Sequence, residues 1–172
     1  GSGPQAAPAG KTLVVGLVAE PTSMDPGQLT DINSMRVLSS VYDTLVRFKE
    51  SSFTLAPGLA MSWTISSDGL QYTFKLRQGV KFHDGTPFNA EAVKFNFLRV
   101  VDPRTGAPRG ASLRELLKSV AALDENTVRV TLKAPYAGFL NLLADPQMFM
   151  ISPAAVKKIV VSARKKWVIS RA

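Results

Sequence analysis

The segment Tyr72–Val93 reads YTFKLRQGVKFHDGTPFNAEAV, and the elements that it encodes decide the fold. Apolar and polar residues alternate up to Leu76, which is typical of a half-buried β-strand. Asp84-Gly85 predicts a tight turn, because glycine readily takes the positive φ that such turns need. Asn89 is a favoured helix N-cap, and Glu91 follows in the first turn, where the helix dipole favours a carboxylate. The segment therefore predicts a strand, a turn and a helix in succession.

Two β-hairpins are expected around this segment, because apolar and polar residues alternate on their arms. The strands are 60–65 and 70–76 in the first hairpin, and 120–123 and 128–132 in the second. Val80–Phe82 is expected to extend the sheet of the first hairpin, and Met148–Ile151 is interpreted as a further short strand.

Apolar residues recur at helical spacing from Ser34 to Val46, which predicts a helix capped by Asp31 or Asn33. The end of this pattern runs into residues 45–48, which also fit a short strand. Further helices are predicted at 89–101, 113–117 and 136–143, and from 154 onward. Strands grouped in adjacent hairpins and mixed with helices indicate an α+β (mixed α/β) fold.

The first 33 residues divide into three segments. Residues 1–10 are expected to be a cloning scar, Gly1-Ser2-Gly3, followed by the disordered start of an exported protein. Residues 12–18 are apolar and β-branched, which predicts a strand buried on both faces. Turn-forming residues dominate 21–33, so a loop is predicted there, and a loop that leaves a buried strand is a favoured ligand position.

The composition of the chain limits the classes of function that are possible. The 172 residues, 45% of them hydrophobic, can bury one sizeable core, and no apolar run approaches the roughly 20 residues that span a bilayer. Cysteine is absent, which excludes disulfides, thiolate metal sites and a cysteine nucleophile. There is no glycine-rich phosphate loop, no zinc-ligand spacing and no nucleophile with a base. We therefore expect no catalytic residues, no cofactor and no metal, and place the only histidine, His83, on the surface or in a turn.

The formal net charge of +8 is concentrated at one end of the chain. Residues 157–172 contain six cations and no acid, and the rest of the chain carries only two more basic than acidic residues. One interpretation of this basic tail is an amphipathic helix that binds anionic lipid or nucleic acid. The other interpretation, which we favour, is a non-native ending of the chain. No nucleic-acid partner is expected, and removal of the tail should abolish any such binding.

Several stretches in a fixed order resemble one family of transport proteins. They are Ala19–Pro21 with Met24–Pro26, Val41–Val46, Leu55–Ala60 with Ser62-Trp63, and Tyr72–Val93. Together they are similar to the extracytoplasmic solute-binding proteins of ABC importers for dipeptides, oligopeptides, glutathione and nickel chelates. The resemblance runs from Leu13 to Val156 and implies an amino-terminal fragment, about the first third of a usual family member.

The resemblance implies a partial first lobe of a periplasmic-binding-protein-like fold plus its inserted peripheral subdomain. Residues 11–50 would open the first lobe, 51–156 would form the inserted α+β subdomain, and 157–172 would be the atypical basic tail. The second lobe, which closes over the ligand in family members, would be missing.

The implied function is the substrate-binding component of an ABC importer for peptides or related small solutes. It would be exported to the periplasm, would carry out no chemistry, and would deliver its ligand to the membrane subunits of a permease. Because one partial lobe cannot close around a ligand, binding is expected to be impaired. The alternative is a non-binding structural module that self-associates through surfaces exposed by truncation.

The resemblance places the loop 20–35 on the ligand cleft, with the stretch 146–149 also reaching it. The predicted ligand-binding residues are Glu20, Met24, Asp31, Asn33, Ser34, Met35, Gln147 and Phe149. Free amides at a helix start would suit a peptide carboxylate or carbonyl, and Met35 could supply an adaptable apolar contact. The alternatives are a plain connecting loop, and core packing for Met35.

Overall fold

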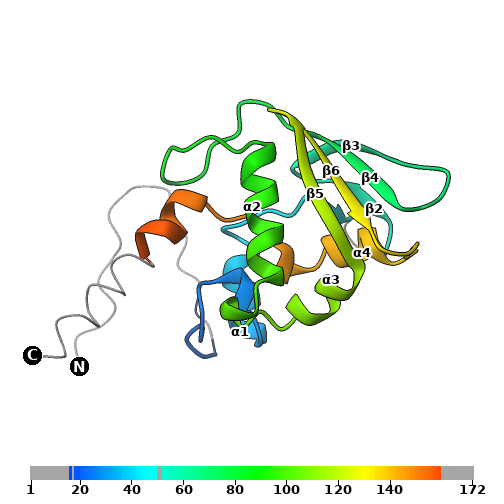
Figure 1. Ribbon diagram of the computed structural model, residues 1–172. Coiled ribbons are helices and arrows are strands. Elements are labelled where there is room, and N and C mark those ends of the chain that lie inside the picture. Colours follow the sequence, from blue (N-terminus) through cyan, green and yellow to red (C-terminus); the bar gives the residue numbers. More distant parts are fainter. Residues whose placement is uncertain (1–15, 17, 50–51, 160–172) are drawn as a thin grey trace, which may run out of the picture.

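The computed structural model of the protein describes residues 16, 18–49 and 52–159. Its main feature is a four-stranded antiparallel sheet in the order β3-β4-β6-β5 (Figure 1). The strands are β3 (Ala60–Ile65), β4 (Gln71–Leu76), β5 (Leu117–Asp124) and β6 (Thr127–Leu132). A second ladder joins β1 (Val46–Phe48) to β2 (Leu55–Pro57).

Both predicted hairpins are confirmed. The β3–β4 hairpin closes where the Ser66 amide donates to the Gln71 carbonyl oxygen at 2.9 Å. The two hairpins join into one sheet because β4 pairs with β6, which sets Phe74 opposite Val128. Alternation in β4 matches the sequence pattern, since Phe74 is fully buried while its neighbours in the strand are not.

The helix α2 (Ala90–Val101) covers the inner face of this sheet and packs against β5 and β6 (Figure 1). It begins as predicted, because the Asn89 side chain accepts a hydrogen bond from the Ala92 amide at 3.0 Å. Val93 and Phe97, one turn apart, are fully buried against the strands. The strand, turn and helix predicted from 72–93 are therefore all present.

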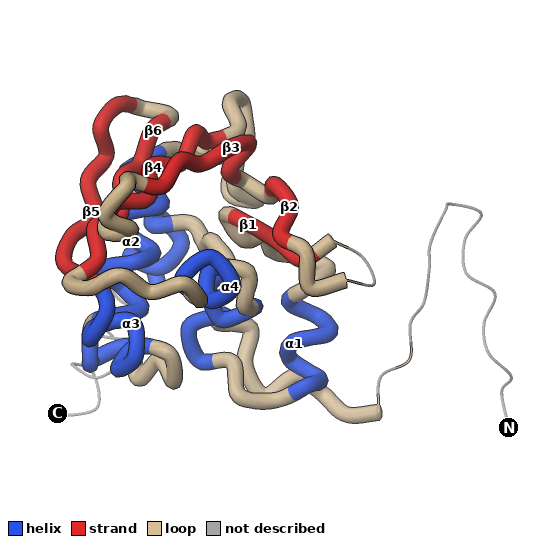
Figure 2. The backbone as a smooth tube through the Cα atoms, turned by 90° about the vertical axis from the view of Figure 1, so that its right-hand side faces the viewer, coloured by secondary structure: helices blue, strands red, loops and turns tan. Residues whose placement is uncertain are grey.

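Shorter helices complete the fold. They are α1 (Ile32–Leu38), α3 (Gly110–Leu116), α4 (Phe139–Leu143) and the 3₁₀ turns η1 (Pro26–Gln28), η2 (Pro103–Thr105) and η3 (Pro146–Met148). Residues 153–159 are also helical, as predicted for the segment from 154 onward. Strands lie on one side of the molecule and helices on the other, which confirms a mixed helix and sheet fold (Figure 2).

One core holds both sheets together. Leu45, just before β1, and Val46, its first residue, are fully buried in one cluster with residues of the larger sheet and its helices, which include Phe74, Phe97 and Phe139. Burial of such side chains is the main favourable term in folding. The first ladder is therefore packed against the main sheet.

The helix predicted from Ser34 is shorter than the sequence pattern indicated, and 46–48 forms β1. The α1 helix ends at Leu38, after which the Ser39 and Ser40 hydroxyls donate to the carbonyl oxygens four residues earlier, at 2.7 and 3.5 Å. Serine side chains that bond to nearby backbone compete with helix continuation. Of the apolar residues after Leu38 in this pattern, Leu45 and Val46 are buried in the core, from a loop and a strand, whereas Val41 is exposed.

Three other element predictions need correction. Val80–Phe82 does not extend the sheet; it belongs to a loop held by a single bridge from Lys81 to Pro87 and by the bond from the Gly85 amide to the Phe82 oxygen at 2.9 Å. Met148–Ile151 forms no strand, because Met148 is the last residue of η3 and the Met150 amide donates to the carbonyl oxygen of Asp43, which lies outside the strands, at 2.9 Å. The next residue, Ile151, bonds a side chain of α2. The helix predicted at 136–143 begins at Phe139.

Some predictions concern residues that the structure does not describe. The leader 1–10, most of the strand predicted at 12–18 and tail residues 160–172 are outside the described residues, as is the predicted boundary at 50–51. The division into lobe and inserted subdomain therefore stays a prediction. Within 16, 18–49 and 52–159, no helix has the length and hydrophobicity needed to cross a membrane.

Candidate functional site

The loop before α1 is tied to the helix start by Asp31. One carboxylate oxygen accepts from the Ser34 amide at 2.9 Å, and the other accepts from the hydroxyls of Ser34 at 2.6 Å and Thr22 at 2.5 Å. The hydrogen bond from the Ser34 hydroxyl, followed by those from its amide and from Thr22, lowers the pKa of Asp31 to about 2. Asp31 therefore stays ionised and fixes the loop.

Ser34 is the second half of this anchor. Its side chain is fully buried, and its hydroxyl oxygen accepts from the amides of Thr22 at 2.9 Å and Ser23 at 3.2 Å. The side chains of Asp31 and Ser34 are thus bonded to the chain itself, and the Met35 amide donates to the Asp31 carbonyl oxygen at 3.1 Å. The amides of Ser34 and Met35 at the helix start already have acceptors within the chain, so these two amides are not the free donors that the sequence analysis expected for a ligand.

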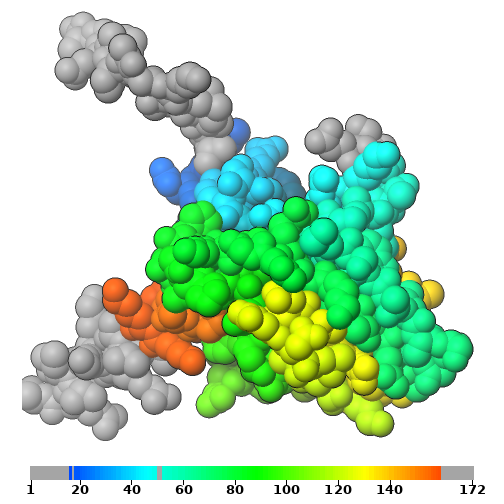
Figure 3. Space-filling model, turned by 90° about the horizontal axis from the view of Figure 1, so that it is seen from above, coloured from blue at the N-terminus to red at the C-terminus, as the bar shows by residue number. Residues whose placement is uncertain are grey.

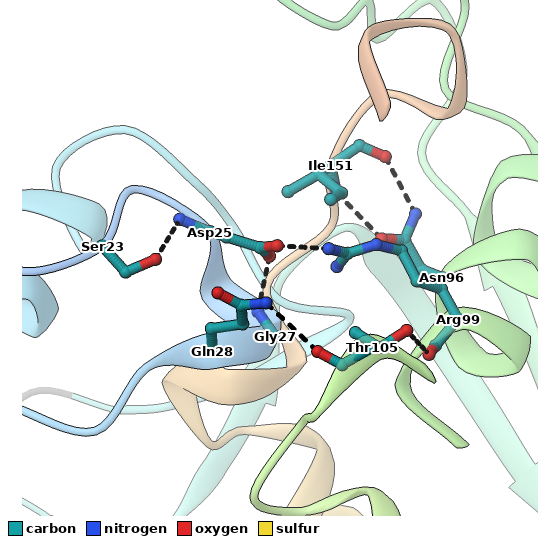
Figure 4. A network of polar contacts seen from close by, with 8 residues as sticks. All are labelled: Ser23, Asp25, Gly27, Gln28, Asn96, Arg99, Thr105 and Ile151. Atoms are coloured by element: carbon teal, nitrogen blue, oxygen red, sulfur yellow. Dashed lines mark hydrogen bonds and ion pairs between the residues drawn. The ribbon is translucent and has the colours of Figure 1, made fainter. Parts of the chain in front are cut away.

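A second anchor holds the same loop against α2, as Figure 4 shows. One Asp25 oxygen accepts from the Gly27 amide at 3.0 Å, and the other pairs with the guanidinium of Arg99. Gln28 donates from its side chain to the Thr105 carbonyl oxygen at 3.2 Å, next to the end of α2. Both Asp25 and Arg99 are largely shielded from water, which strengthens their attraction.

The structure brings together the two segments that were predicted to face a ligand. The Gln147 side-chain amide donates to the Leu29 carbonyl oxygen at 2.9 Å, so two residues 118 positions apart in the chain meet. The side-chain carbonyl oxygen (Oε1) of Gln147 is buried and has no hydrogen-bond partner among the described residues. The turn η3 that carries Gln147 packs against η1 in the first loop.

The aromatic ring of Phe149 lies beside Tyr42, with ring centroids 6.3 Å apart and an interplanar angle of 33°. Tyr42 also meets His83 edge to face at 6.5 Å. Burial of Tyr42, with a smaller contribution from the Asp25 charge, raises the pKa of its hydroxyl above the usual value. The sequence analysis did not predict Tyr42 at the site, because Tyr42 lies in an apolar pattern of helical spacing that indicates packing and not ligand binding. His83 is exposed, as expected.

Asn96 is a further residue that the sequence analysis missed. It is 4% exposed on α2, and its side chain accepts from the Ile151 amide at 3.1 Å and donates to the Ile151 carbonyl oxygen at 2.9 Å (Figure 4). Together with the bond from the Met150 amide to the Asp43 carbonyl oxygen at 2.9 Å, it holds the segment that carries Phe149. The available signal was a polar residue on the buried side of a helix, which requires hydrogen-bond partners.

The remaining predicted residues differ in exposure. Met24 is 48% exposed and Glu20 is exposed, whereas Asn33 and Met35 are half-buried. Within the described part of the chain, the side chains of Glu20 and Asn33 make no hydrogen bond, so both have unused polar groups. No hydrogen bond joins Glu20, Met24 or Asn33 to the Gln147 segment among these residues.

The signature around Asp84 has a structural role, as its sequence predicts. Asp84 accepts from the Thr86 amide at 3.0 Å and from the hydroxyl of Ser152, which begins the helical segment 153–159. The hydrogen bonds from Ser152 and then Thr86 lower the pKa of Asp84. The turn therefore holds the last described segment of the chain in place.

An open groove lies elsewhere, with a volume of about 610 Å³, and none of the predicted ligand residues lines it. Its walls are the ends of β3 and β4 and the β5–β6 turn, including Lys75, Arg77 and Asp124. Among the residues that the structure describes, no group of three or more His, Asp or Glu side chains could hold a metal ion.

Comparisons with known proteins agree on one family. Residues 54–168 match the family described as bacterial extracellular solute-binding proteins, family 5 Middle, and the match includes part of the basic tail. The glutathione-binding protein GsiB of Escherichia coli K12 is 43% identical over 150 residues, which are 87% of this chain and 29% of that protein. The chain therefore spans less than a third of the length of this curated relative.

Two solved structures have a similar fold. A periplasmic oligopeptide-binding protein from Borrelia burgdorferi matches 81% of this chain and 31% of its own, with a TM-score of 0.76 and 28% identity. The periplasmic binding protein DppA from Helicobacter pylori, in complex with the peptide STSA, matches 86% of this chain and 32% of its own, with a TM-score of 0.75 and 35% identity. The fold therefore resembles part of a periplasmic binding protein, and the chain belongs to family 5 of the bacterial extracellular solute-binding proteins.

Proposed function

We propose that this chain forms one wall of the ligand site in the solute-binding component of an ABC importer for peptides or related small solutes. The observation that carries the proposal is the bond from Gln147 to Leu29, because it joins the two segments predicted to face the ligand. The named relatives support the ligand class, since one is a glutathione-binding protein and another was solved with a tetrapeptide.

The arrangement of side chains fits a short peptide. Asn33 offers an amide that can both donate and accept, and the aromatic ring of Phe149 offers an apolar face beside Tyr42. Met24 and Met35 add flexible apolar contacts that adapt to different side chains. Asp31, Ser34, Asp25 and Arg99 support the wall from behind, because their polar groups are already bonded within the chain.

The partners and the location follow from the same proposal. The membrane subunits of an ABC permease would receive the ligand, and the protein would work in the periplasm after export. The named structural relatives are periplasmic binding proteins, which supports this location. No chemistry on the ligand is needed for this role.

The affinity of the 172-residue chain for peptides is part of the proposal. Periplasmic binding proteins close two domains around a ligand, which buries it and gives tight binding. A single wall leaves most of a peptide in water, so we expect a dissociation constant weaker than about 100 µM for the chain by itself. The purely structural module is the second candidate, and the comparisons do not favour it.

Titration calorimetry with glutathione and with di- to pentapeptides tests the proposal. We expect weak binding that Asn33→Ala reduces at least about threefold, because one ligand hydrogen bond is lost. Asn141→Ala is the matched control, since Asn141 is an exposed asparagine on α4, and it should leave the affinity unchanged. Submicromolar affinity would contradict a single wall, and equal effects of the two substitutions would contradict the location of the site.

A further inference from the structure

The two edges of the main sheet differ in a way that points to an interaction surface. The order β3-β4-β6-β5 leaves β3 and β5 at the edges, where unpaired backbone groups can pair with another chain. The β5 edge carries Lys118 and Asp124, and its pairing register shifts near both ends. Charges and irregular register are common ways in which proteins block edge pairing.

The β3 edge has little of this protection. Its sequence, AMSWTI, contains no charged residue and no proline, and its one register shift lies at its start, between Ala60 and Ser62. Met61 and Ile65 are 57% and 48% exposed. An uncharged edge strand with exposed apolar side chains is the kind that pairs with another strand.

The backbone pattern shows which groups of β3 are free. The Ser66–Gln71 pair is hydrogen-bonded, so in an antiparallel ladder the bonded pairs continue at Thr64–Thr73 and Ser62–Lys75. The N–H and C=O groups of Trp63 and Ile65 therefore point away from β4. At the start of β3, the outward amide of Ala60 is already paired, because it donates to the Leu45 carbonyl oxygen at 2.9 Å. Beyond Ala60, no other backbone segment of the described chain is hydrogen-bonded to this edge.

The sequence of this edge is self-complementary. If two copies of β3 pair antiparallel with Trp63 opposite Trp63, then Met61 faces Ile65 and Ser62 faces Thr64 on each side. This register uses the outward N–H and C=O groups of Trp63 and Ile65, pairs apolar with apolar side chains, and brings no like charges together. A two-fold axis through the pair makes one surface serve both partners.

We propose that β3 is a pairing edge for a second copy of this chain, which joins the two four-stranded sheets into one continuous sheet. The β3–β4 hairpin lies at the opposite end of the molecule from the helical segment 153–159 (Figures 1 and 3). This inference does not depend on the proposed ligand or on the wall that binds it. It assigns self-association to five residues, 61–65.

Sedimentation velocity over a range of about 10 µM to about 1 mM protein tests the proposal, because small interfaces bind in this range. We expect a concentration-dependent shift from monomer to dimer. Hydrogen exchange at the two extremes should show that the Trp63 and Ile65 amides become more protected with concentration, while β5 amides do not change. A monomer at every concentration would overturn the proposal, and a strand of another protein would then be the partner to test at this edge.

Two substitutions locate the surface. Ile65→Pro removes an outward N–H without removing a β4 bond, and proline is tolerated on such edges, so it should weaken dimerisation at least about tenfold. If that variant fails to fold, Thr64→Lys serves instead, because it adds charge beside the symmetry axis. Ser119→Lys is its matched control, since both residues are exposed on the outer face of an edge strand. Dimerisation unchanged by Thr64→Lys, or equally weakened by Ser119→Lys, would contradict the assignment to β3.

Discussion

Asn96 and Arg99 illustrate how single polar residues on α2 position the candidate site. Each reaches a segment far away in sequence: Asn96 bonds Ile151, and Arg99 pairs with Asp25. The sequence could predict the Asn89 cap, because a cap acts within three residues of itself. It could not predict the Asn96 and Arg99 contacts, because their partners are 55 and 74 positions away.

Replacement of Asn96 should destabilise the protein strongly. Asn96→Ala leaves the buried amide and carbonyl groups of Ile151 without partners, which should cost about 2–4 kcal/mol of the free energy of unfolding. Urea denaturation measures this loss. The exposed Asn141→Ala should change the free energy of unfolding by less than about 0.5 kcal/mol, and a similarly small loss for Asn96→Ala would contradict the role given to its side chain.

The ionised Asp31 predicts a specific dependence of stability on pH. Its pKa in the folded protein is about 2, below the usual 3.8, so the charge stabilises the fold above pH 3.8 and this contribution is lost as the pH falls towards 2. Asp31→Asn keeps a residue that caps helices well but removes the charge. The difference in free energy of unfolding between the wild type and this variant should therefore shrink between pH 4 and pH 2. A difference that is constant over this range would show that the charge is not involved.

Strands and helices with strong local signals were predicted well, and those that depend on distant contacts were not. The hairpins and α2 follow from alternation, turn residues and a cap, all of which act locally. By contrast, apolar spacing alone could not show that the chain leaves its helix at Leu38 and enters β1 at Val46. The short ladder of β1 and β2 was not predicted as a pair, since three-residue strands carry little sequence pattern.

Gly58, between β2 and β3, marks a close approach that should tolerate no side chain. A Cβ there would lie 2.5 Å from the Thr44 carbonyl oxygen and 3.0 Å from that of Leu45, and neither backbone atom can move freely. Gly58→Ala should therefore cost more than about 2 kcal/mol of the free energy of unfolding.

Gly79→Ala is the useful comparison for Gly58→Ala. A Cβ at Gly79 would meet nothing within 4 Å, but its φ of 72° is unfavourable for alanine, so the expected cost is only about 1 kcal/mol. Thermal or urea denaturation of both variants gives the order of the two costs. The reverse order would contradict the close packing of the β2–β3 connection against residues 44–45.

At the scale of the whole molecule, the family could be predicted because its most specific stretch, 72–93, encodes a turn and a cap that the fold requires. The match of residues 54–168 confirms that prediction. The candidate site was predicted only in part. The loop 20–35 and the stretch 146–149 were named from the resemblance, but no local sequence pattern indicates that Gln147 meets Leu29 or that the Ser34 hydroxyl bonds to Asp31.

The central claim is that these two segments form one wall of a peptide-binding site, and chemical-shift mapping of backbone amides tests it most directly. The chain would be titrated with the tetrapeptide Ser-Thr-Ser-Ala to about 10 mM, a concentration that detects even millimolar binding. We predict that the largest shifts occur at amides in 20–35 and 147–149, with β5 and β6 unchanged. An absence of shifts, or shifts confined to the groove between β3, β4 and the β5–β6 turn, would contradict the claim.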